Sequence, residues 1–296
     1  MSTQTHAHDA GKYYVPHSSQ WPIVGSIGLF VLMWGAVITL NDWSTAWALL
    51  PGALFIVYLF FGWFRTVIGE NQAGLYNLEV DKSFRMGMIW FIASEVLFFA
   101  VFFGALFYTR ELSVPWLSGE GVKIFNKLMI WKNYDAAWPT NGPGVIGGKA
   151  DGSFETIPAF GLPAWNTAIL LTSGVTITIA HHALRAGNRA VLKIFLAATF
   201  LLGFLFVYLQ ATEYHHAYTE LGLKLSTGIY GSTFFMLTGF HGLHVTIGAI
   251  MLTVIWLRTM KGHFTPQRHF AFEAAAWYWH FVDVVWLILF VFVYWI

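Results

Sequence analysis

The sequence predicts an all-α, polytopic membrane protein. Hydrophobic residues fill 57% of its 296 positions and charged residues only 10%, whereas soluble domains hold about 25% charged residues. Seven stretches are apolar over the length of about 20 residues that a helix needs to cross a bilayer. The chain has no cysteine, which excludes disulfides, thiolate metal sites and cysteine nucleophiles. A net charge of +1 gives no reason to expect a nucleic-acid partner.

The predicted spans fall into two groups. The first two are separated by a short turn, Asn41-Asp42-Trp43-Ser44, and therefore form a tight antiparallel hairpin. We predict an inner-side segment 1–20, a two-helix arm 21–67, a connecting segment 68–83, and a five-helix bundle 84–296 with an outer-side loop 111–162. The predicted spans are Trp21–Leu40, Trp47–Val67, Phe84–Tyr108, Pro163–Leu184, Val191–Thr212, Tyr230–Leu257 and Phe272–Trp295.

The distribution of basic residues predicts the orientation of the chain. Lys and Arg in short loops favour the inner side of the membrane. Ten of them fall on the side of the amino terminus and six on the other side. Five of those six belong to or border the long loop 111–162, where the bias is weakest. We therefore expect the amino terminus inside, in the cytoplasm, and the carboxyl terminus outside, in the periplasm.

The last span carries ionisable residues that are unusual in a membrane. Glu273, His280 and Asp283 lie within an otherwise apolar stretch. Residues 273, 277, 280 and 284 recur at helical spacing and share one face, which Asp283 borders. A carboxylate in hydrocarbon is costly and is usually turned inward or paired. We therefore expect this stripe to face partners from two other spans.

Spans three and six supply those candidate partners. Glu95 lies about 15 Å beyond Arg85 along a helix, near the middle of the bilayer. His241 and His244 are three residues apart and share a face of span six. The sequence predicts a polar network in which Glu95 and Asp283 meet these histidines. Glu95 can act either as a proton-linked carboxyl or as a structural hydrogen-bonding group, and we predict no metal site and no catalytic residue.

Three other classes of membrane protein are less well supported. A retinal protein needs a Schiff-base lysine in its last span, and 272–296 contains none. Desaturase-like di-iron enzymes use clustered histidine boxes, and none is complete here; the pairs His181-His182 and His215-His216 sit near span ends. An autonomous proton or ion transporter would be expected to show an internal repeat with broken helices, which is not visible, although this alternative remains open.

Two arginines end spans on the predicted inner side. Arg65 ends span two, close to Trp63, and Arg258 ends span six. Each can extend to the headgroup region as long cationic side chains commonly do. Each can also bind a lipid phosphate specifically. The sequence leaves both readings open.

Seven runs of residues, most of them within the predicted spans, match the motifs of a known family. They are Ser94-Glu95-Val96-Leu97-Phe98-Phe99, Ser173-Gly174-Val175-Thr176, Ala180-His181-His182, Gln210-Ala211-Thr212-Glu213-Tyr214, Tyr230-Gly231-Ser232-Thr233-Phe234-Phe235, Gly239-Phe240-His241-Gly242-Leu243-His244 and Phe272-Glu273-Ala274-Ala275-Ala276-Trp277-Tyr278-Trp279-His280-Phe281-Val282-Asp283-Val284-Val285-Trp286. With these motifs the sequence resembles subunit III of cytochrome c oxidase. The last run is the most specific, and the resemblance spans the chain from Trp21 to its end.

The resemblance implies a seven-helix subunit in which two helices and five helices form a V around bound phospholipids. Such a subunit carries no haem or copper, which belong to partner subunits. Its main contact is oxidase subunit I, with subunit II in the same complex, and it supports proton uptake and protects the complex during turnover. The complex reduces oxygen to water with electrons from cytochrome c and pumps protons. We expect a bacterial inner membrane.

The resemblance also assigns roles to individual residues. Glu95 matches the family's buried reactive carboxyl, and His241 and His244 match its span-six histidines. Arg258 resembles a lipid-headgroup contact, and the same lipid region is bordered by Trp63, Arg65 and Glu70.

Two departures from the family and one alternative accompany this resemblance. Tyr76-Asn77 stands where many members have a histidine pair, and the outer loop is longer than in the mitochondrial protein. The third subunit of a quinol oxidase shares the fold and remains the alternative, which the sequence of the partner subunit II would decide.

Overall fold

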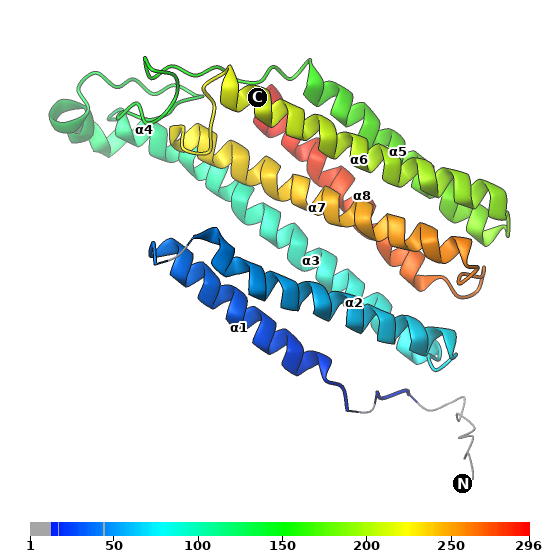
Figure 1. The fold of residues 1–296 in the computed structure, drawn as a ribbon. Helices are drawn as coiled ribbons and strands as arrows, with labels where there is room; N and C mark the ends of the chain where they lie inside the picture. Colours follow the sequence, from blue (N-terminus) through cyan, green and yellow to red (C-terminus); the bar gives the residue numbers. More distant parts are fainter. Residues whose placement is uncertain (1–12, 17, 44) are drawn as a thin grey trace, which may run out of the picture. The chain divides into compact units, whose positions relative to one another are not determined.

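The computed structural model describes residues 13–16, 18–43 and 45–296, so most of the predicted segment 1–20 lies outside the described residues. Every regular element in these ranges is helical (Figure 1). Seven helices are long and apolar enough to cross a membrane, which confirms the predicted all-α polytopic fold. The chain forms two compact units, Met1–Met86 and Gly87–Ile296. The domain boundaries at 68–83 and the V arrangement stay predictions.

The first unit is built on a helical hairpin. It contains α1 (Trp21–Leu40), the short η1 (Ala46–Leu49) and α2 (Leu50–Gln72). A proline lies in the first turn of both α1 and α2, where its missing N–H costs nothing. The two helices pack closely at Gly52, where a Cβ would collide with the backbone of Leu32. The Trp21 Nε1–H donates to Thr66 Oγ1 at 3.1 Å and ties the start of α1 to the end of α2.

The helix α3 (Leu78–Tyr108) starts six residues before the predicted span. The Asn77 side chain accepts a hydrogen bond from the Val80 N–H at 3.0 Å, and Glu79 and Asp81 lie in the first turn. Acidic side chains there stabilise the positive end of the helix dipole. The polar residues 78–83 therefore belong to the helix. After α3 come η2 (Thr109–Ser113), α4 (Val114–Leu117), η3 (Gly121–Lys123) and η4 (Asn126–Ile130), and then an irregular stretch up to residue 161.

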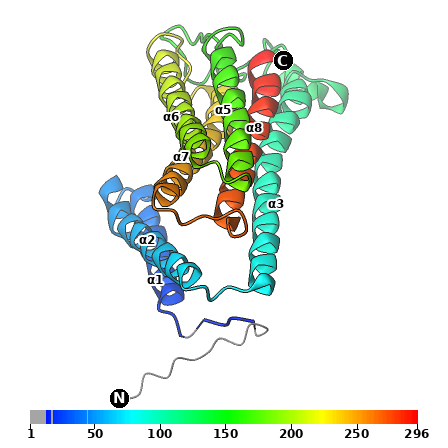
Figure 2. The same cartoon turned by 90° about the vertical axis from the view of Figure 1, so that its right-hand side faces the viewer.

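Four long helices complete the second unit: α5 (Leu162–Arg185), α6 (Arg189–Thr219), α7 (Gly228–Met260) and α8 (Phe270–Leu289), which η5 (Phe290–Trp295) follows. Figure 2 shows these helices together with α3. The turn between α5 and α6 is short because Gly187 takes a φ of 75° and the Asn188 side chain accepts from the Val191 N–H at 3.2 Å. Residues 261–269 join α7 to α8.

The core of the second unit is organised around α8. In its apolar stretch, 56% of the residues lie inside the structure, against 11% in α1. Trp279 and Trp286 are fully buried, and each indole N–H is satisfied by α5: Trp279 donates to Ser173 Oγ at 2.9 Å, and Trp286 donates to Thr167 Oγ1 at 2.8 Å. Because a membrane interior offers no water, such internal partners are required. They hold α8 in one orientation against α5.

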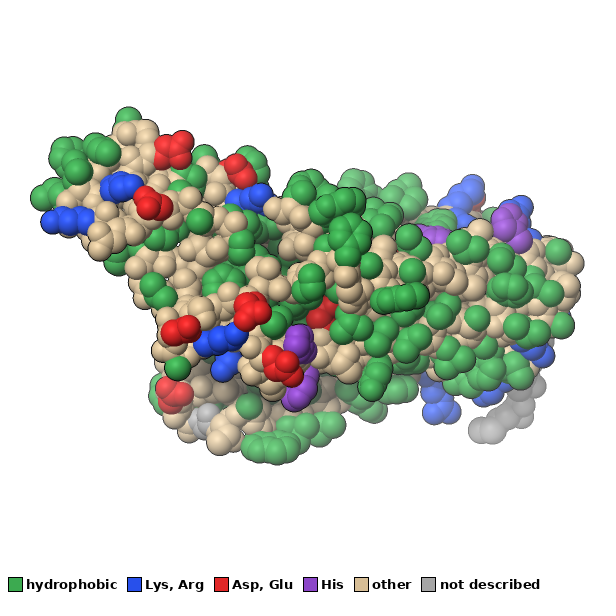
Figure 3. All heavy atoms as spheres, turned by 90° about the horizontal axis from the view of Figure 1, so that it is seen from above, with side chains coloured by type: hydrophobic (Ala, Val, Ile, Leu, Met, Phe, Trp, Pro, Cys, Tyr) green, Lys and Arg blue, Asp and Glu red, His purple; other side chains and the backbone are tan. Residues whose placement is uncertain are grey.

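The surface has the character expected of a membrane protein. In Figure 3, apolar side chains cover the long middle of the visible face, and charged side chains gather toward its two ends. This distribution fits a molecule whose middle lies in hydrocarbon and whose ends reach the headgroups.

Candidate functional site

A carboxyl–imidazole pair joins α3 to α7. Glu95 Oε2 lies 2.9 Å from His244 Nε2, and His244 Nδ1 lies 2.6 Å from the Phe240 carbonyl oxygen. A carbonyl oxygen can only accept, so Nδ1 carries a hydrogen. The contact at Nε2 therefore holds a second proton, either on the imidazole or on the carboxyl. The pair is a single unit that shares one proton, and it lies between the predicted spans three and six.

Aromatic rings surround this pair. The His244 ring lies 5.9 Å from Phe98, 5.0 Å from Phe99 and 6.4 Å from Tyr278, measured between ring centroids. The Tyr278 hydroxyl donates to the His244 backbone oxygen at 3.4 Å. The side chain of Glu95 is still 21% exposed and that of His244 11% exposed. The pair thus lies at the edge of the second unit, where a neighbouring molecule can reach it.

His241 has a different environment from His244. It is fully buried, and its Nε2 lies 3.2 Å from the Val282 carbonyl oxygen of α8, so Nε2 is the donor. Its ring lies 5.1 Å from the Trp286 ring. His241 thus turns to α8 while His244 turns to α3. Although they share a helix face, their ring nitrogens have separate partners and do not converge on one ligand position.

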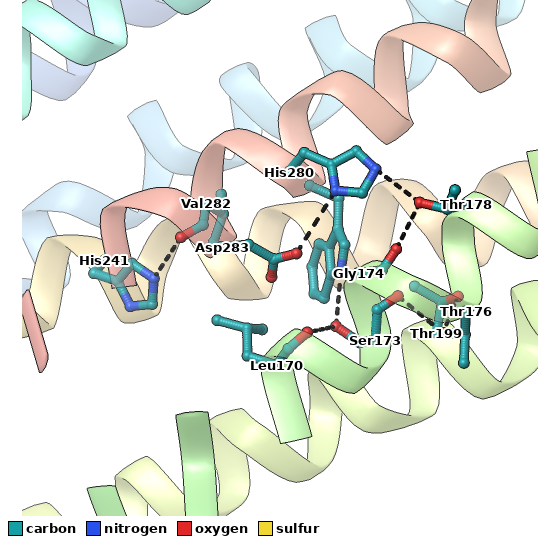
Figure 4. A network of polar contacts seen from close by, with 11 residues as sticks. Leu170, Ser173, Gly174, Thr176, Thr178, Thr199, His241, His280, Val282 and Asp283 are labelled. Atoms are coloured by element: carbon teal, nitrogen blue, oxygen red, sulfur yellow. Dashed lines mark hydrogen bonds and ion pairs between the residues drawn. The ribbon is translucent and has the colours of Figure 1, made fainter. Parts of the chain in front are cut away.

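Asp283 and His280 of α8 lie against α5 (Figure 4). Asp283 Oδ2 lies 3.8 Å from His280 Nδ1, and His280 Nε2 lies 3.3 Å from Thr178 Oγ1. Gly174 makes this possible, because a Cβ there would collide with Asp283 Oδ2. The predicted network among spans three, six and seven therefore forms only in part: Glu95 meets His244, while Asp283 is buried against a span that the prediction did not include.

The stripe 273, 277, 280, 284 was expected to face partners from two other spans, and for part of its length it does not. His280 is 45% exposed at its side chain, and Val284 is 55% exposed. The reason is the orientation of α8: Trp279 and Trp286 occupy the buried face, which turns the stripe toward the outside of the second unit.

Glu273, at the start of the same stripe, lies among histidines. Its Oε1 is 3.2 Å from His269 Nε2 and 3.6 Å from His181 Nε2. One ligand atom from each of these three residues lies within 4.8 Å of the others, so the group could hold a metal ion. It is the one such group found among the described residues. The prediction that this chain holds no metal stays a prediction.

A second buried carboxyl was missed by the sequence reasoning. Glu213 Oε1 accepts from the Tyr294 hydroxyl at 2.7 Å and from Gln210 Nε2 at 3.1 Å. The other oxygen, Oε2, is buried and has no hydrogen-bond partner in the structure. Span five was predicted to end at Thr212, which placed Glu213 outside the membrane, whereas α6 continues to Thr219. The spacing of Gln210 and Glu213, which puts both on one helix face, was the available signal.

Arg258 lies in the last turn of α7 and is buried. Its guanidinium carbon is 4.6 Å from the centre of the Phe264 ring, and its Nε and Nη2 are buried with no partner in the structure. Arg189 Nη2 donates to the Phe264 carbonyl oxygen at 2.5 Å, while its Nη1 is also buried and unpartnered. Burial and then the positive charges of Arg258 and Lys261 lower the pKa of the neighbouring His263. Unused cationic donors therefore collect at this end of α6 and α7.

The three other predicted lipid contacts lie in the first unit. Trp63 and Arg65 are exposed. Glu70 instead accepts hydrogen bonds from two tyrosines, from Tyr76 at 2.6 Å and from Tyr14 at 3.2 Å. Burial, and then the bond to Glu70, raises the pKa of both phenols. Tyr76 is thus a partner of Glu70 in this chain.

The fold and these pairs define a class: a polytopic, all-α membrane protein whose ionisable side chains meet one another between helices. A family model described as Cytochrome c oxidase subunit III matches residues 11–130 and 120–296. The chain therefore belongs to the cytochrome c oxidase subunit III family, as the sequence motifs indicated.

Similar full-length proteins agree with this assignment. A protein of Dugong dugon named Cytochrome c oxidase subunit 3 is 42% identical over 296 residues, covering 100% of this chain and 99% of the relative. Proteins of the same name from Carassius auratus and Coturnix japonica are each 41% identical over 290 residues, covering 98% of this chain and 98% of each relative. The chain is thus a subunit of an oxygen-reducing respiratory complex and associates with other oxidase subunits.

Proposed function

We propose that this subunit binds an anionic phospholipid at Arg258 and supports proton uptake by the complex through the pair Glu95–His244. It handles no electrons itself, since the haems and copper belong to its partners, and it stabilises subunit I, its main contact, in a complex that also contains subunit II. The membrane is the inner membrane of a bacterium, with the amino terminus in the cytoplasm and the carboxyl terminus in the periplasm.

The observation that carries the lipid proposal is the unpaired guanidinium of Arg258. A buried charge without a counter-ion costs several kcal/mol, yet Arg258 Nε and Nη2 have no partner among the described residues, and neither does Arg189 Nη1. A phosphate group offers oxygens that two guanidinium N–H groups can bind at once. Phe264, which contacts both arginines, holds them at one end of the helices, where a headgroup lies.

The lipid proposal is tested on the intact purified oxidase carrying Arg258→Ala. We expect fewer tightly bound phospholipids per complex than in the wild type, counted by mass spectrometry after delipidating washes. Arg110→Ala is the matched control, because it removes the same charge from a residue whose guanidinium lies 3.4 Å from Glu111. An unchanged phospholipid count in Arg258→Ala would contradict the proposal.

The geometry of Glu95 and His244 supports the proton-uptake proposal. The two residues share one proton across 2.9 Å, and their partial exposure lets a neighbouring subunit exchange protons with them. Neither Glu95 nor His244 belongs to the candidate metal-binding group found among the described residues. A proton-holding pair near a partner surface is what support of proton uptake requires.

The orientation is tested with single cysteines, since the chain contains none. Lys261→Cys and Asp151→Cys lie in segments outside the candidate spans. In intact cells, a membrane-impermeant maleimide should label the second and not the first. The reverse pattern would invert the proposed topology.

A further inference from the structure

We propose that the α5–α8 face, defined by Val175, Thr178, His280 and Val284, packs against a transmembrane helix of a partner oxidase subunit, on which a polar group forms a hydrogen bond with His280. The proposal rests on membership of a multi-subunit complex. It is independent of the lipid and proton-uptake proposals.

The first step is the depth of His280 in the membrane. It lies ten residues after Phe270 and fifteen before Trp295, the ends of the last candidate span. At 1.5 Å per residue, His280 is about 15 Å from the nearer end of the helix, close to the middle of a hydrocarbon layer about 30 Å thick. Ionisable residues at this depth almost always face protein or a water-filled cavity.

The second step is that the described residues of this chain cover the His280 side chain only in part. Its side chain is 45% exposed, although every other His, Asp and Glu named above in α7 and α8 is more deeply covered. The contact with Thr178 measures 3.3 Å, and the 3.8 Å between Nδ1 and Asp283 exceeds a hydrogen-bond distance. The imidazole is therefore only partly satisfied from within.

The third step concerns Asp283 beneath the histidine. Its Oδ1 is buried and has no hydrogen-bond partner in the structure, and its Oδ2 is pressed against Gly174. Asp283 thus lies buried against α5, while the neighbouring His280 lies at the surface of the second unit. Figure 4 shows His280 reaching from α8 toward Thr178 of α5, with Asp283 beside it.

The fourth step is the shape of the surrounding surface. Val175 is 59% and Val284 55% exposed, and Thr178 is exposed beside them. Small and β-branched side chains let a second helix approach closely, as at many helix–helix contacts in membranes. Lipid chains could cover the valines equally well. They cannot form a hydrogen bond with the imidazole, and this favours a helix with a polar side chain over lipid.

The surface is tested by photo-crosslinking in the assembled oxidase in native membranes. A photoreactive p-benzoylphenylalanine replaces Val284, so that His280 stays in place. The same probe at Leu201, a residue of α6 with similar exposure, measures how much crosslinking to lipid an exposed position gives. We expect the adduct at Val284 to contain a transmembrane peptide of another oxidase subunit, identified by mass spectrometry. Adducts with lipid alone, or only with residues of this chain's own α1 and α2, would overturn the proposal.

The hydrogen bond is tested with two variants of His280. His280→Leu should lower the fraction of this subunit retained on the purified oxidase several-fold, while His280→Gln, whose amide can still donate and accept, should retain most of it. Val284→Leu is the control for a change of volume without a polar loss. Equal retention of the Leu and Gln variants would rule out the hydrogen bond, and the crosslink would still decide the surface.

Discussion

Glu95 Oε2 and His244 Nε2 lie 2.9 Å apart although 149 residues separate them in the chain. The contact joins α3 to α7. Among the described residues, side chains of α3 form few other hydrogen bonds with the other helices of the second unit. In its apolar stretch only 11% of the residues are buried. The same bond therefore has two consequences: it helps to position α3, and it holds one shared proton near the edge of the unit.

The proton-holding role predicts a kinetic effect of Glu95→Gln. The amide keeps the size of the side chain and can still form a hydrogen bond with His244, but it cannot exchange a proton with it. We expect steady-state oxygen consumption by the purified oxidase to fall several-fold while the subunit stays bound. Glu79→Gln, an exposed change at the start of α3, should leave the rate unchanged. Full activity of Glu95→Gln would contradict the proton-holding role and leave Glu95 with only the structural role of positioning α3.

The pairing also predicts chemical reactivity. Hydrophobic carbodiimides modify protonated carboxyls in apolar surroundings, and His244 competes with Glu95 for their shared proton. We expect Glu95 to be labelled, and labelled faster in His244→Leu, because no base remains to take its proton. Peptide mass spectrometry measures the rate. Slower labelling in His244→Leu would show that the proton resides elsewhere.

Gly174 predicts a stability effect at the contact between α5 and α8. A methyl group in Gly174→Ala would collide with Asp283 Oδ2, and Asp283 is buried. Overpacking of this kind costs about 1–3 kcal/mol. We expect the subunit to dissociate from the purified oxidase at a lower temperature. Gly242→Ala on α7, where a Cβ meets nothing within 4 Å, should have no such effect, and equal behaviour of the two variants would contradict the steric argument.

The buried carboxyl of Glu213 predicts that Tyr294 contributes to stability. In Tyr294→Phe, Glu213 loses the donor at 2.7 Å and keeps only Gln210 at 3.1 Å. Removing one partner of a buried polar group costs about 1–3 kcal/mol. We expect a lower thermal midpoint for this variant, while Tyr208→Phe, an exposed change on α6, should match the wild type. If both variants have the thermal midpoint of the wild type, the hydrogen bond between Tyr294 and Glu213 does not contribute to stability.

The number and order of the spans could be predicted from sequence, because the length of an apolar stretch is enough to identify a crossing helix. The ends of the helices were harder to place. Glu79 and Asp81 are polar and were assigned to a connection, yet they lie in the first turn of α3, where the helix dipole favours them. The same error at the end of α6 hid Glu213.

The orientation of each helix could not be predicted, for a physical reason. Lipid tails are as apolar as a protein core, so the periodicity of apolar residues does not distinguish a buried face from a lipid-facing one. The meeting of Glu95 with His244 was predicted because both are polar and lie at the same depth. The exposure of His280 was not, because it depends on where Trp279 and Trp286 pack, and apolar residues cover every face of α8.

The connection between α4 and α5 predicts a dependence on pH. Lys149 Nζ lies 2.5 Å from Glu155 Oε1, and its hydrogen bond and charge lower the pKa of Glu155 below its ordinary value of 4.5. Hydrogen bonds from Ser153 lower the pKa of Asp151 in the same way. A carboxyl whose pKa is lower in the folded state than in the unfolded state stabilises the folded state when the pH is above the unfolded-state pKa. This stabilisation is lost as the pH falls through the folded-state pKa.

Hydrogen exchange of residues 148–156, corrected for the intrinsic effect of pH, should therefore be constant from about pH 8 to 5 and rise below about pH 4. In Lys149→Gln the pKa of Glu155 returns toward its ordinary value, so the rise below pH 4 should be smaller and exchange at neutral pH somewhat faster. Lys132→Gln, in the same connection, should behave like the wild type. Since the pair is exposed and screened by salt, the difference should shrink at high ionic strength, and a difference that persists there would point to a cause other than this ion pair.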